Sequence, residues 1–424
     1  MKLSQGMAME LAGQNHSAFA ESAGWVAQRS EVAAPDVTIV MPCLNEIQSL
    51  PHCIANALDA LALLRTELGM SGEIVIADNG SSDGSQALAT ELGARVVPIA
   101  QRGYGAALIG GCRAAAGRYI VMGDCDGSYN FVEGVAMVAK LDEGYELCMG
   151  NRFKGGIAPG AMPWKNRHIG NPGLTGVLNL FFRTGIRDAH CGLRAIRKEA
   201  FERLGLSGSG MEFASEMVIK AALLKLRMTE VPATLSVDLR DRAPHLRPWR
   251  DGWRHLRYLF MLSPTWVFAL PGMAALTLSA AIFTVALLYL FGALPGEPLV
   301  GTSWSIVAGF LATCGHLALI MAVAAHLFGV SKGFRLLRPV LRRNAGWLTL
   351  ETMLVSGLAL IALGLAGLAA VTVWWGKGGF VALDTQLPLI LFATAGAIGF
   401  QNVLGGFLLS VIAGNESQFL PGRS

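Results

Sequence analysis

Charged residues are scarce in this chain of 424 residues. Asp, Glu, Lys and Arg make up 15% of it, whereas hydrophobic residues make up 53%. Ordinary soluble domains are about 25% charged. The composition therefore excludes a wholly soluble protein and predicts that part of the chain lies in a membrane.

A C-x-x-C pair is absent, and the seven cysteines are odd in number. This pattern argues against a disulfide framework or a structural zinc site and suits a reducing cytosol. Residues 1–34 also lack the apolar core, roughly 7–15 residues long, of a signal peptide. We expect them to form a disordered N-terminal extension, or to reflect an upstream start codon.

Long apolar runs are absent before residue 265 and frequent after it. Four of them exceed the ~20 residues that a helix needs to cross a bilayer. These runs are residues 266–291, 303–328, 348–374 and 387–412. We therefore expect a soluble domain over residues 35–240, a transmembrane domain of four helices over 265–414 and a tail over 415–424.

The basic residues beside these runs predict the orientation. The loop at 331–347 contains one lysine, four arginines and no acid, and the segment at 240–257 contains six arginines and two aspartates. Cytoplasmic loops are enriched in such residues. We therefore expect a multi-pass protein of the inner (cytoplasmic) membrane, with the soluble domain, the basic loop and the C-terminal tail facing the cytoplasm.

The segment just before the first apolar run mixes arginines with aromatic residues, as in "RPWRDGWRHLRYLF". This mixture is typical of a helix that lies in the membrane interface. We expect an interfacial amphipathic segment over residues 241–264. The alternative is a basic flank that serves only the topology.

The soluble part alternates short apolar runs with helical patterns. We expect strands at residues 37–41, 73–77, 95–99, 119–122 and 146–149, and helices at 49–68, 85–92, 106–116 and 132–141. This alternation predicts an α/β domain with a mostly parallel sheet and helices on both faces. Ligands bind such sheets beyond the carboxyl ends of the strands.

Two aspartates, Asp124 and Asp126, follow the predicted strand at 119–122. Two carboxylates at one strand end repel each other unless a cation lies between them. Their oxygens suit Mg²⁺ or Mn²⁺. The alternative is an ordinary acidic turn. Polar residues at the other strand ends favour the metal site.

Gly103 and Gly105 follow the third predicted strand and open a helix, as in a dinucleotide-binding turn. Leu108 stands where that motif has its third glycine or an alanine, which argues against a nicotinamide cofactor. The glycines instead allow a close approach of the backbone to a ligand, or a tight start of the helix.

Four stretches occur in the order "VTIVMPCLNE", "IVIADNGSSDGS", "RGYGAALIGGCRAAAGRYIVMGDCDGSY" and "MGNRFKGG". Over residues 36–260 the chain resembles glycosyltransferase family 2, and within it the polyprenyl-phosphate mannosyl- and glucosyltransferases. The resemblance implies a GT-A nucleotide-binding fold. It also implies metal-dependent, inverting transfer of a hexose from a GDP-mannose or UDP-glucose type of donor to a polyprenyl phosphate on the cytoplasmic leaflet.

The resemblance implies roles for particular residues. Nucleotide and substrate contacts would come from Pro42, Asn45, Glu46, Asp78, Ser81, Asp83, Gly103, Gly105 and Asp124. Asp124 and Asp126 would hold the metal, and Arg152 would meet a phosphate of the donor or acceptor. Arg167, with Asn171 or Thr175, would belong to the acceptor site. Asp188 and Arg194 match an acid and an arginine of the family; Asp188 would orient the acceptor, hold an arginine or act as a base.

Two departures from the family pattern matter. Ser128 stands where many relatives have a glutamine that binds the metal, and the Gln-x-x-Arg-Trp motif of polymer-forming relatives is absent. The alternative function is transport of a lipid-linked sugar by the membrane part, with a degenerate transferase domain. We expect no nucleic-acid partner. Glycines and alanines around residues 359–370 predict close helix packing, within one chain or in a homo-oligomer.

Overall fold

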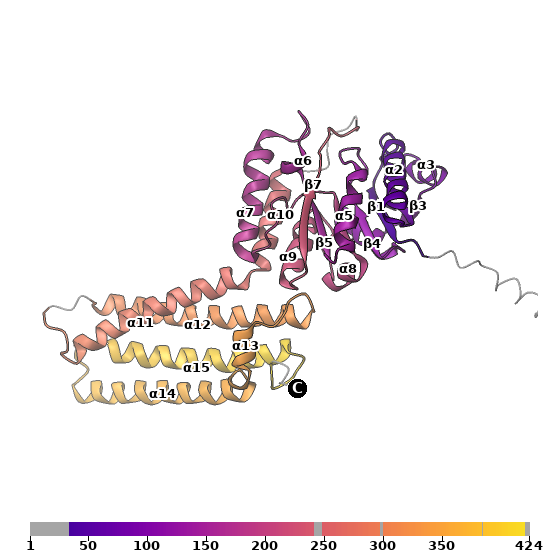
Figure 1. The fold of residues 1–424 in the computed structure, drawn as a ribbon. Coiled ribbons are helices and arrows are strands. Elements are labelled where there is room, and N and C mark those ends of the chain that lie inside the picture. The colour runs from indigo at the N-terminus through magenta and orange to yellow at the C-terminus, as the bar shows by residue number, and fades with distance from the viewer. Residues whose placement is uncertain (1–33, 241–247, 297–299, 384, 420–424) are drawn as a thin grey trace, which may run out of the picture.

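The computed structural model describes residues 34–240, 248–296, 300–383 and 385–419. Figure 1 shows a sheet domain at the top and four long helices side by side beneath it. The predicted N-terminal extension lies outside the described residues except for residue 34. The same holds for residues 241–247 of the predicted interfacial segment and for 420–424 of the predicted tail.

The sheet domain is built on seven described strands in the order β3-β2-β1-β4-β6-β5-β7. The strands are β1 Val37–Cys43, β2 Gly72–Asp78, β3 Arg95–Pro98, β4 Tyr119–Met122, β5 Leu147–Asn151, β6 Arg194–Arg197 and β7 Met228–Pro232. Strand β6 runs antiparallel to β4 and β5, and the other pairs are parallel. The predicted mostly parallel sheet is confirmed.

The predicted strands correspond to β1 through β5, but the sequence analysis missed β6 and β7. Strand β6 has the sequence Arg-Ala-Ile-Arg, and β7 ends in a proline. Both strands are short and carry charged residues, so neither has the apolar run typical of a buried strand. The sheet is therefore two strands wider than expected.

Helices cover both faces of the sheet. They are α2 Leu50–Leu68, α3 Ser85–Glu91, α4 Tyr104–Ala114, α5 Gly134–Asp142, α6 Arg152–Gly155, α7 Asn171–Phe182, α8 Lys198–Leu204, α9 Phe213–Leu223 and α10 Pro248–Met261. One buried cluster joins the sheet to α2 and α5, and a second joins it to α4, α7, α8, α9 and α10. Such two-sided burial stabilises strands that are apolar on both faces, as β1 is.

The ends of the longer helices follow local chemistry. Helix α2 has a proline in its first turn and ends at Gly69, whose φ of 66° lies in the left-handed region that favours glycine. Helix α14 Leu350–Lys377 begins with a capping box, in which the side chains of Thr349 and Thr352 each accept a hydrogen bond from the other's backbone N–H. These residues set where the helices begin and end.

The C-terminal part forms a bundle of four long helices. They are α11 Leu270–Leu290, α12 Thr302–Ser331, α14 Leu350–Lys377 and α15 Leu387–Ile412. A π-helical segment, Thr265–Ala269, directly precedes α11, and the short helix α13 Pro339–Arg343 lies in the basic loop. The four segments of 26 to 30 residues are long and apolar enough to cross a membrane. The protein is therefore an integral membrane protein.

Close packing holds the bundle together. Helices α14 and α15 approach so closely that a Cβ on Gly364 would lie 2.8 Å from the Cα of Gly396. The predicted close packing around residues 359–370 thus occurs within one chain. Leu350, the first residue of α14, donates its N–H to the carbonyl of Ser417, which holds the last described residues beside the start of α14.

Helix α10 joins the two parts of the molecule. Its Leu259 and His255 are buried toward α7 and α9, whereas Trp253 and Met261 are exposed. Phe260 and Trp266 both pack against Phe181 of α7. The predicted segment is therefore helical and amphipathic over its described residues, and one face docks onto the sheet domain.

Candidate active site

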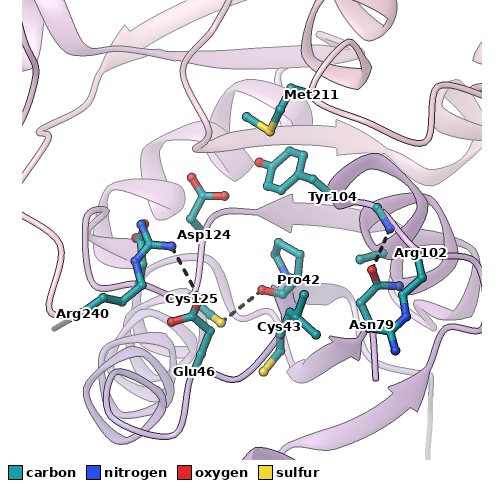
Figure 2. A pocket seen from close by; sticks show the side chains of 14 residues that line it. Pro42, Cys43, Glu46, Asn79, Arg102, Tyr104, Asp124, Cys125, Met211 and Arg240 are labelled. Atoms are coloured by element: carbon teal, nitrogen blue, oxygen red, sulfur yellow. Dashed lines mark hydrogen bonds and ion pairs between the residues drawn. The ribbon is translucent and has the colours of Figure 1, made fainter. Parts of the chain in front are cut away.

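A cavity of about 410 Å³ lies where β1, β2 and β4 end and α4 begins. Figure 2 shows the side chains that line it. They belong to Pro42, Cys43, Leu44, Glu46, Asn79, Arg102, Gly103, Tyr104, Ala107, Asp124, Cys125, Asp126, Met211 and Arg240. The size is in the usual range for a pocket that binds a small molecule, and the position is the one expected for an open α/β sheet.

Asp124 lies two residues beyond the end of β4 and projects into this cavity (Figure 2). Burial and the negative charge of Asp126 raise the pKa of the Asp124 carboxyl to about 6, although a hydrogen bond from the Tyr104 hydroxyl opposes this shift. The charged form is therefore less favourable than in an ordinary aspartate, and a bound cation would stabilise it. Asp124 is a carboxylate poised to bind one.

Asp126, 8% exposed, is the second acid of the pair. Its Oδ1 accepts hydrogen bonds from the N–H of Ser128 at 3.0 Å and from the Ser128 hydroxyl at 2.6 Å. Its Oδ2 accepts a hydrogen bond from Arg240 at 2.7 Å. Ser128 thus orients Asp126.

The residues present fit a divalent metal ion. Within the described residues, no group of three or more His, Cys, Asp and Glu side chains is placed to hold a metal. However, Mg²⁺ is commonly bound by one or two carboxylates together with phosphate oxygens and water. Asp124 and Asp126 supply two such carboxylates, so the site suits a metal that is shared with a phosphorylated ligand.

The loops after β1 and β2 brace each other. Asn45, with a left-handed φ of 57°, accepts a hydrogen bond from the N–H of Ser82 at 2.8 Å and donates its own N–H to the Ser81 hydroxyl. Asp83 accepts the N–H of Ile47. Asn45, Ser81 and Asp83 therefore shape the cavity rim without being among the residues that line it.

Asp78, 1% exposed, ends β2 beneath this rim. Its carboxylate accepts hydrogen bonds from the backbone N–H groups of Gly80 and Ser81 and from the side chain of Gln86. The neighbouring Asn79 accepts the N–H of Gly103 at 2.7 Å. In this arrangement Asp78 stabilises the turn, and Asn79 lines the cavity.

Gly103 and Gly105 allow a close approach, and the approaching segment belongs to the protein itself. A Cβ on Gly103 would overlap the carbonyl oxygen of Ser209, and a Cβ on Gly105 would overlap that of Gly208. The loop that contains these carbonyls also brings Met211 to the cavity. Gly103 lines the cavity, whereas Gly105 makes room for the loop.

Arg152 and Asp188 form a buried ion pair outside the cavity lining. The guanidinium Nε and Nη2 each lie 2.8 Å from a carboxylate oxygen of Asp188, and the backbone N–H of Arg152 donates to Oδ2. Asp188 is fully buried and Arg152 is 7% exposed. This geometry matches the expectation that Asp188 holds an arginine, and its oxygens are engaged in that task.

The other predicted residues also lie outside the cavity lining. Arg194 is 3% exposed and donates to the carbonyls of Cys191 and Ala214. Arg167 is exposed, and Asn171 donates its side-chain amide to the sulfur of Met162. The structure thus brings Pro42, Glu46, Gly103, Asp124 and Asp126 to one cavity, and leaves Arg152, Arg167, Asn171, Asp188 and Arg194 outside its lining.

Several residues that line the cavity were not predicted from the sequence. Arg240 was counted only as part of a basic segment, and Tyr104, Arg102, Asn79 and Met211 were assigned no role. The position of Tyr104 between two glycines at a strand end was the available clue. Arg240 reaches Asp126 across 114 residues of sequence, and no local pattern predicts such a contact.

Comparison with known families matches both parts of the chain. Residues 38–205 match the model described as glycosyl transferase family 2. Residues 323–413 match that of the glycosyltransferase family 2 C-terminal transmembrane region. The cavity residues up to Cys125 and Asp126 lie within the first match, and three of the four membrane-crossing helices lie wholly or partly within the second.

Individual relatives are similar over different lengths. A low-salt glycan biosynthesis hexosyltransferase of Haloferax volcanii, Agl6, is 34% identical over 89% of each chain. A dolichyl-phosphate hexose transferase of the same organism is 27% identical over 50% of this chain and 87% of its own. Glucosyl-3-phosphoglycerate synthase from Mycobacterium tuberculosis, solved with Mn²⁺ and UDP, is 19% identical, with a TM-score of 0.40 over 53% of this chain and 79% of that one.

Proposed function

Because the chain belongs to glycosyltransferase family 2, we propose that this membrane glycosyltransferase moves a hexose from a nucleotide sugar to a polyprenyl phosphate. The donor is of the GDP-mannose or UDP-glucose type, and the transfer inverts the anomeric carbon. Residues 35–240 form the catalytic domain, and residues 265–414 hold it at the bilayer. The cavity that Asp124 and Asp126 share with Asn79 and Arg102 carries the proposal.

Two further observations support the lipid acceptor. The described part of the chain has four helices suited to crossing a membrane, and a polyprenyl chain stays in the bilayer, so its phosphate must be met at the membrane surface. A relative that matches along half of this chain is named a dolichyl-phosphate hexose transferase. The basic loop and the C-terminal end lie at one end of the bundle (Figure 1), which favours the cytoplasmic leaflet.

The proposed reaction requires little from a base. An oxygen of the acceptor phosphate attacks the anomeric carbon, the bond from that carbon to the donor diphosphate breaks, and its electron pair stays on the departing oxygen. A phosphate monoester has a second pKa of about 6, so the attacking oxygen is already ionised near neutral pH. Asp188, fully engaged with Arg152, is therefore not needed as a base.

The residues of the cavity stabilise the departing diphosphate. Asp124 and Asp126 would hold Mg²⁺ or Mn²⁺, which supplies positive charge to the diphosphate oxygens. Arg102 and Arg240 line the same cavity and add guanidinium groups that suit phosphate oxygens. Asp78, Asn45 and Glu46 hold the two loops at the nucleotide end of the cavity. Arg152, presented by Asp188, is the candidate group for the acceptor phosphate.

The test uses the full-length protein in detergent with Mn²⁺, a polyprenyl phosphate and a panel of radiolabelled nucleotide sugars. We expect label from one donor to enter the organic phase and EDTA to abolish it. Asp124→Asn should lower the rate at least about a hundredfold, as loss of a preorganised charge clamp does. An absence of both transfer and donor hydrolysis with every sugar would favour the transport alternative.

A further inference from the structure

A second cavity, of about 500 Å³, lies where the sheet domain meets the bundle. Its walls come from the end of α10, the start of the first membrane segment, the last turns of α12 and α15, and the basic loop. Most of the lining is apolar, including Phe268, Met321 and Leu408, but Arg335 and Lys220 also border it. An apolar chamber with cations at one side suits an amphiphilic ligand.

Arg335 is the unexplained group in this cavity. Its side chain comes from the basic loop after α12 and is only 7% exposed. Its Nη2 donates to the carbonyl of Leu262 at 2.6 Å, but its Nε has no hydrogen-bond partner. A buried guanidinium with an unsatisfied N–H requires an explanation.

The charge of Arg335 also lacks compensation. None of the ion pairs among the described residues includes it. Burial, and then the positive charge of Arg338, lower the pKa of its guanidinium to about 10. By contrast, Lys220 is paired with Glu216 at 2.7 Å. An anion beside Arg335 would therefore reduce the free-energy cost of burying this charge, which the ion pairs of the protein do not offset.

A role in membrane topology alone does not explain this position. Arg342 and Arg343 in the same loop are exposed to solvent, where they satisfy the positive-inside rule with hydrated side chains. Arg335 turns inward and packs against Gly329, where an added Cβ would lie 3.1 Å from its Nε. The positive-inside rule therefore does not explain why Arg335 is buried.

The walls of the cavity connect it with the lipid. Met261, Met321, Phe328 and Leu408 all line the cavity, yet each is between 38% and 67% exposed. Three of them lie on α12 and α15, near the ends of membrane-crossing helices. A hydrocarbon chain can therefore pass between the bilayer and the cavity without crossing water.

We propose that this cavity binds the phosphate headgroup of an anionic membrane lipid, with Arg335 contacting the phosphate oxygens and the apolar wall receiving the start of the hydrocarbon chains. The guanidinium provides planar N–H donors that match phosphate oxygens. The site is separate from the active-site cavity and does not depend on the donor or acceptor proposed above.

One loop joins the two cavities. Ser207 borders the lipid cavity, and its N–H and that of Gly208 donate to Glu216, the partner of Lys220. The carbonyls of the next residues pack against the start of α4, and Met211 lines the active-site cavity. A lipid phosphate at Arg335 would thus lie against the loop that forms one wall of the active site.

The test measures binding of phosphatidylglycerol to the full-length protein in detergent, by native mass spectrometry, with phosphatidylcholine as the reference lipid. We expect Arg335→Met to weaken phosphatidylglycerol binding about tenfold, as loss of one charged hydrogen-bonding partner does. Arg342→Met, the same change at an exposed arginine of the same loop, is the matched control and should change it less than about twofold.

A second variant keeps the test decisive if Arg335→Met does not fold. Ala325→Trp fills the cavity from α12 and leaves Arg335 in place, so it should reduce binding to a similar extent; size-exclusion chromatography and circular dichroism verify folding. Unchanged phosphatidylglycerol binding in a folded variant would overturn the proposal. So would displacement of the lipid by millimolar inorganic phosphate, because the site would then accept a soluble anion.

Discussion

Nη2 of Arg240 lies 2.7 Å from Oδ2 of Asp126, so a guanidinium from the end of the sheet domain neutralises the second acid of the Asp-x-Asp pair. The same guanidinium lies 3.0 Å from Asp238 and 3.5 Å from Glu46. These three carboxylates share one guanidinium, which lines the cavity. Arg240 therefore supplies positive charge at the point where these carboxylates converge.

Arg240→Ala should destabilise the protein when no divalent metal is present. Asp126 and Glu46 are nearly buried, and removing their cation leaves charges with fewer partners, at a cost of about 1–3 kcal/mol. We expect a lower thermal unfolding midpoint in EDTA and a larger increase on adding Mn²⁺ than in the wild type. Arg118→Ala, at an exposed ion pair with Asp36, should cost less than about 1 kcal/mol. Equal midpoints for Arg240→Ala and the wild type in EDTA would contradict this account.

Asp188→Leu should be more damaging than a typical substitution. Arg152 would remain buried without its carboxylate, and an isolated buried charge of this kind costs about 3–5 kcal/mol. The double variant Arg152→Met with Asp188→Leu replaces the pair by apolar groups and should regain most of that stability. Chemical denaturation of the three proteins measures both effects.

The same double variant separates a structural role from a catalytic one. If Arg152 meets a phosphate of the substrates, the double variant should fold but transfer sugar at least about a hundredfold more slowly. Near-normal transfer by the folded double variant would show that the ion pair has only a structural role. The stability measurement alone does not distinguish these roles.

The parts of the fold that the sequence predicted are those with a long or strongly periodic pattern. Strand β1 is an almost unbroken apolar run, and each of the four membrane segments is longer than the helices of the sheet domain. Strands β6 and β7 are short, and Arg194 at the start of β6 is buried through hydrogen bonds to backbone carbonyls. Its burial depends on tertiary contacts, which a local pattern does not contain.

The residues of the site also divide into those that a local pattern predicts and those that tertiary contacts bring together. Asp124 and Asp126 could be predicted because their spacing at a strand end is a local feature. The pairing of Arg152 with Asp188 and of Arg240 with Asp126 joins residues 36 and 114 positions apart. The glycines at 103 and 105 were predicted to let the backbone approach a ligand, or to let the helix start tightly. The approaching group, a loop of the same chain, depends on the folded arrangement.

Gly192→Ala should impair the site without altering any charged group. A Cβ at this position would lie 2.7 Å from Oδ2 of Asp124 and 2.7 Å from the ring of Tyr129. Contacts this short force the carboxylate to move, so we expect a higher Mn²⁺ requirement and a rate at least about tenfold lower, since misplacement by ~1 Å has large effects. Activity measured across a Mn²⁺ titration tests this.

Gly173→Ala provides the matched control for that substitution. Gly173 lies in α7, and nothing is within 4 Å of its added Cβ. The change should leave the Mn²⁺ requirement unaltered and stabilise the helix slightly, because alanine is the better helix former. A Gly192→Ala enzyme with the same metal dependence as Gly173→Ala would show that Asp124 tolerates the displacement.

The adjacent histidines His190, which is half-buried, and His255, which is buried, should make the stability of the protein depend on pH. Burial, and then the charges of His255 and Arg152, hold the pKa of His190 well below its ordinary value of 6.5. The rings are 4.9 Å apart, and within the described residues the Nδ1 of His190 has no partner. The folded protein therefore keeps this imidazole neutral.

The sign of the effect follows from the proton balance. Below about pH 6.5 the unfolded chain takes up a proton at His190 that the folded protein does not. The free energy of unfolding therefore decreases as the pH is lowered, by up to about 1.4 kcal/mol per pH unit. His190→Gln removes this uptake, and the variant should lose less stability than the wild type between pH 7 and pH 5. Denaturation curves over this range measure the difference. Parallel losses in the two proteins would mean that His190 becomes protonated in the folded state as readily as in the unfolded chain.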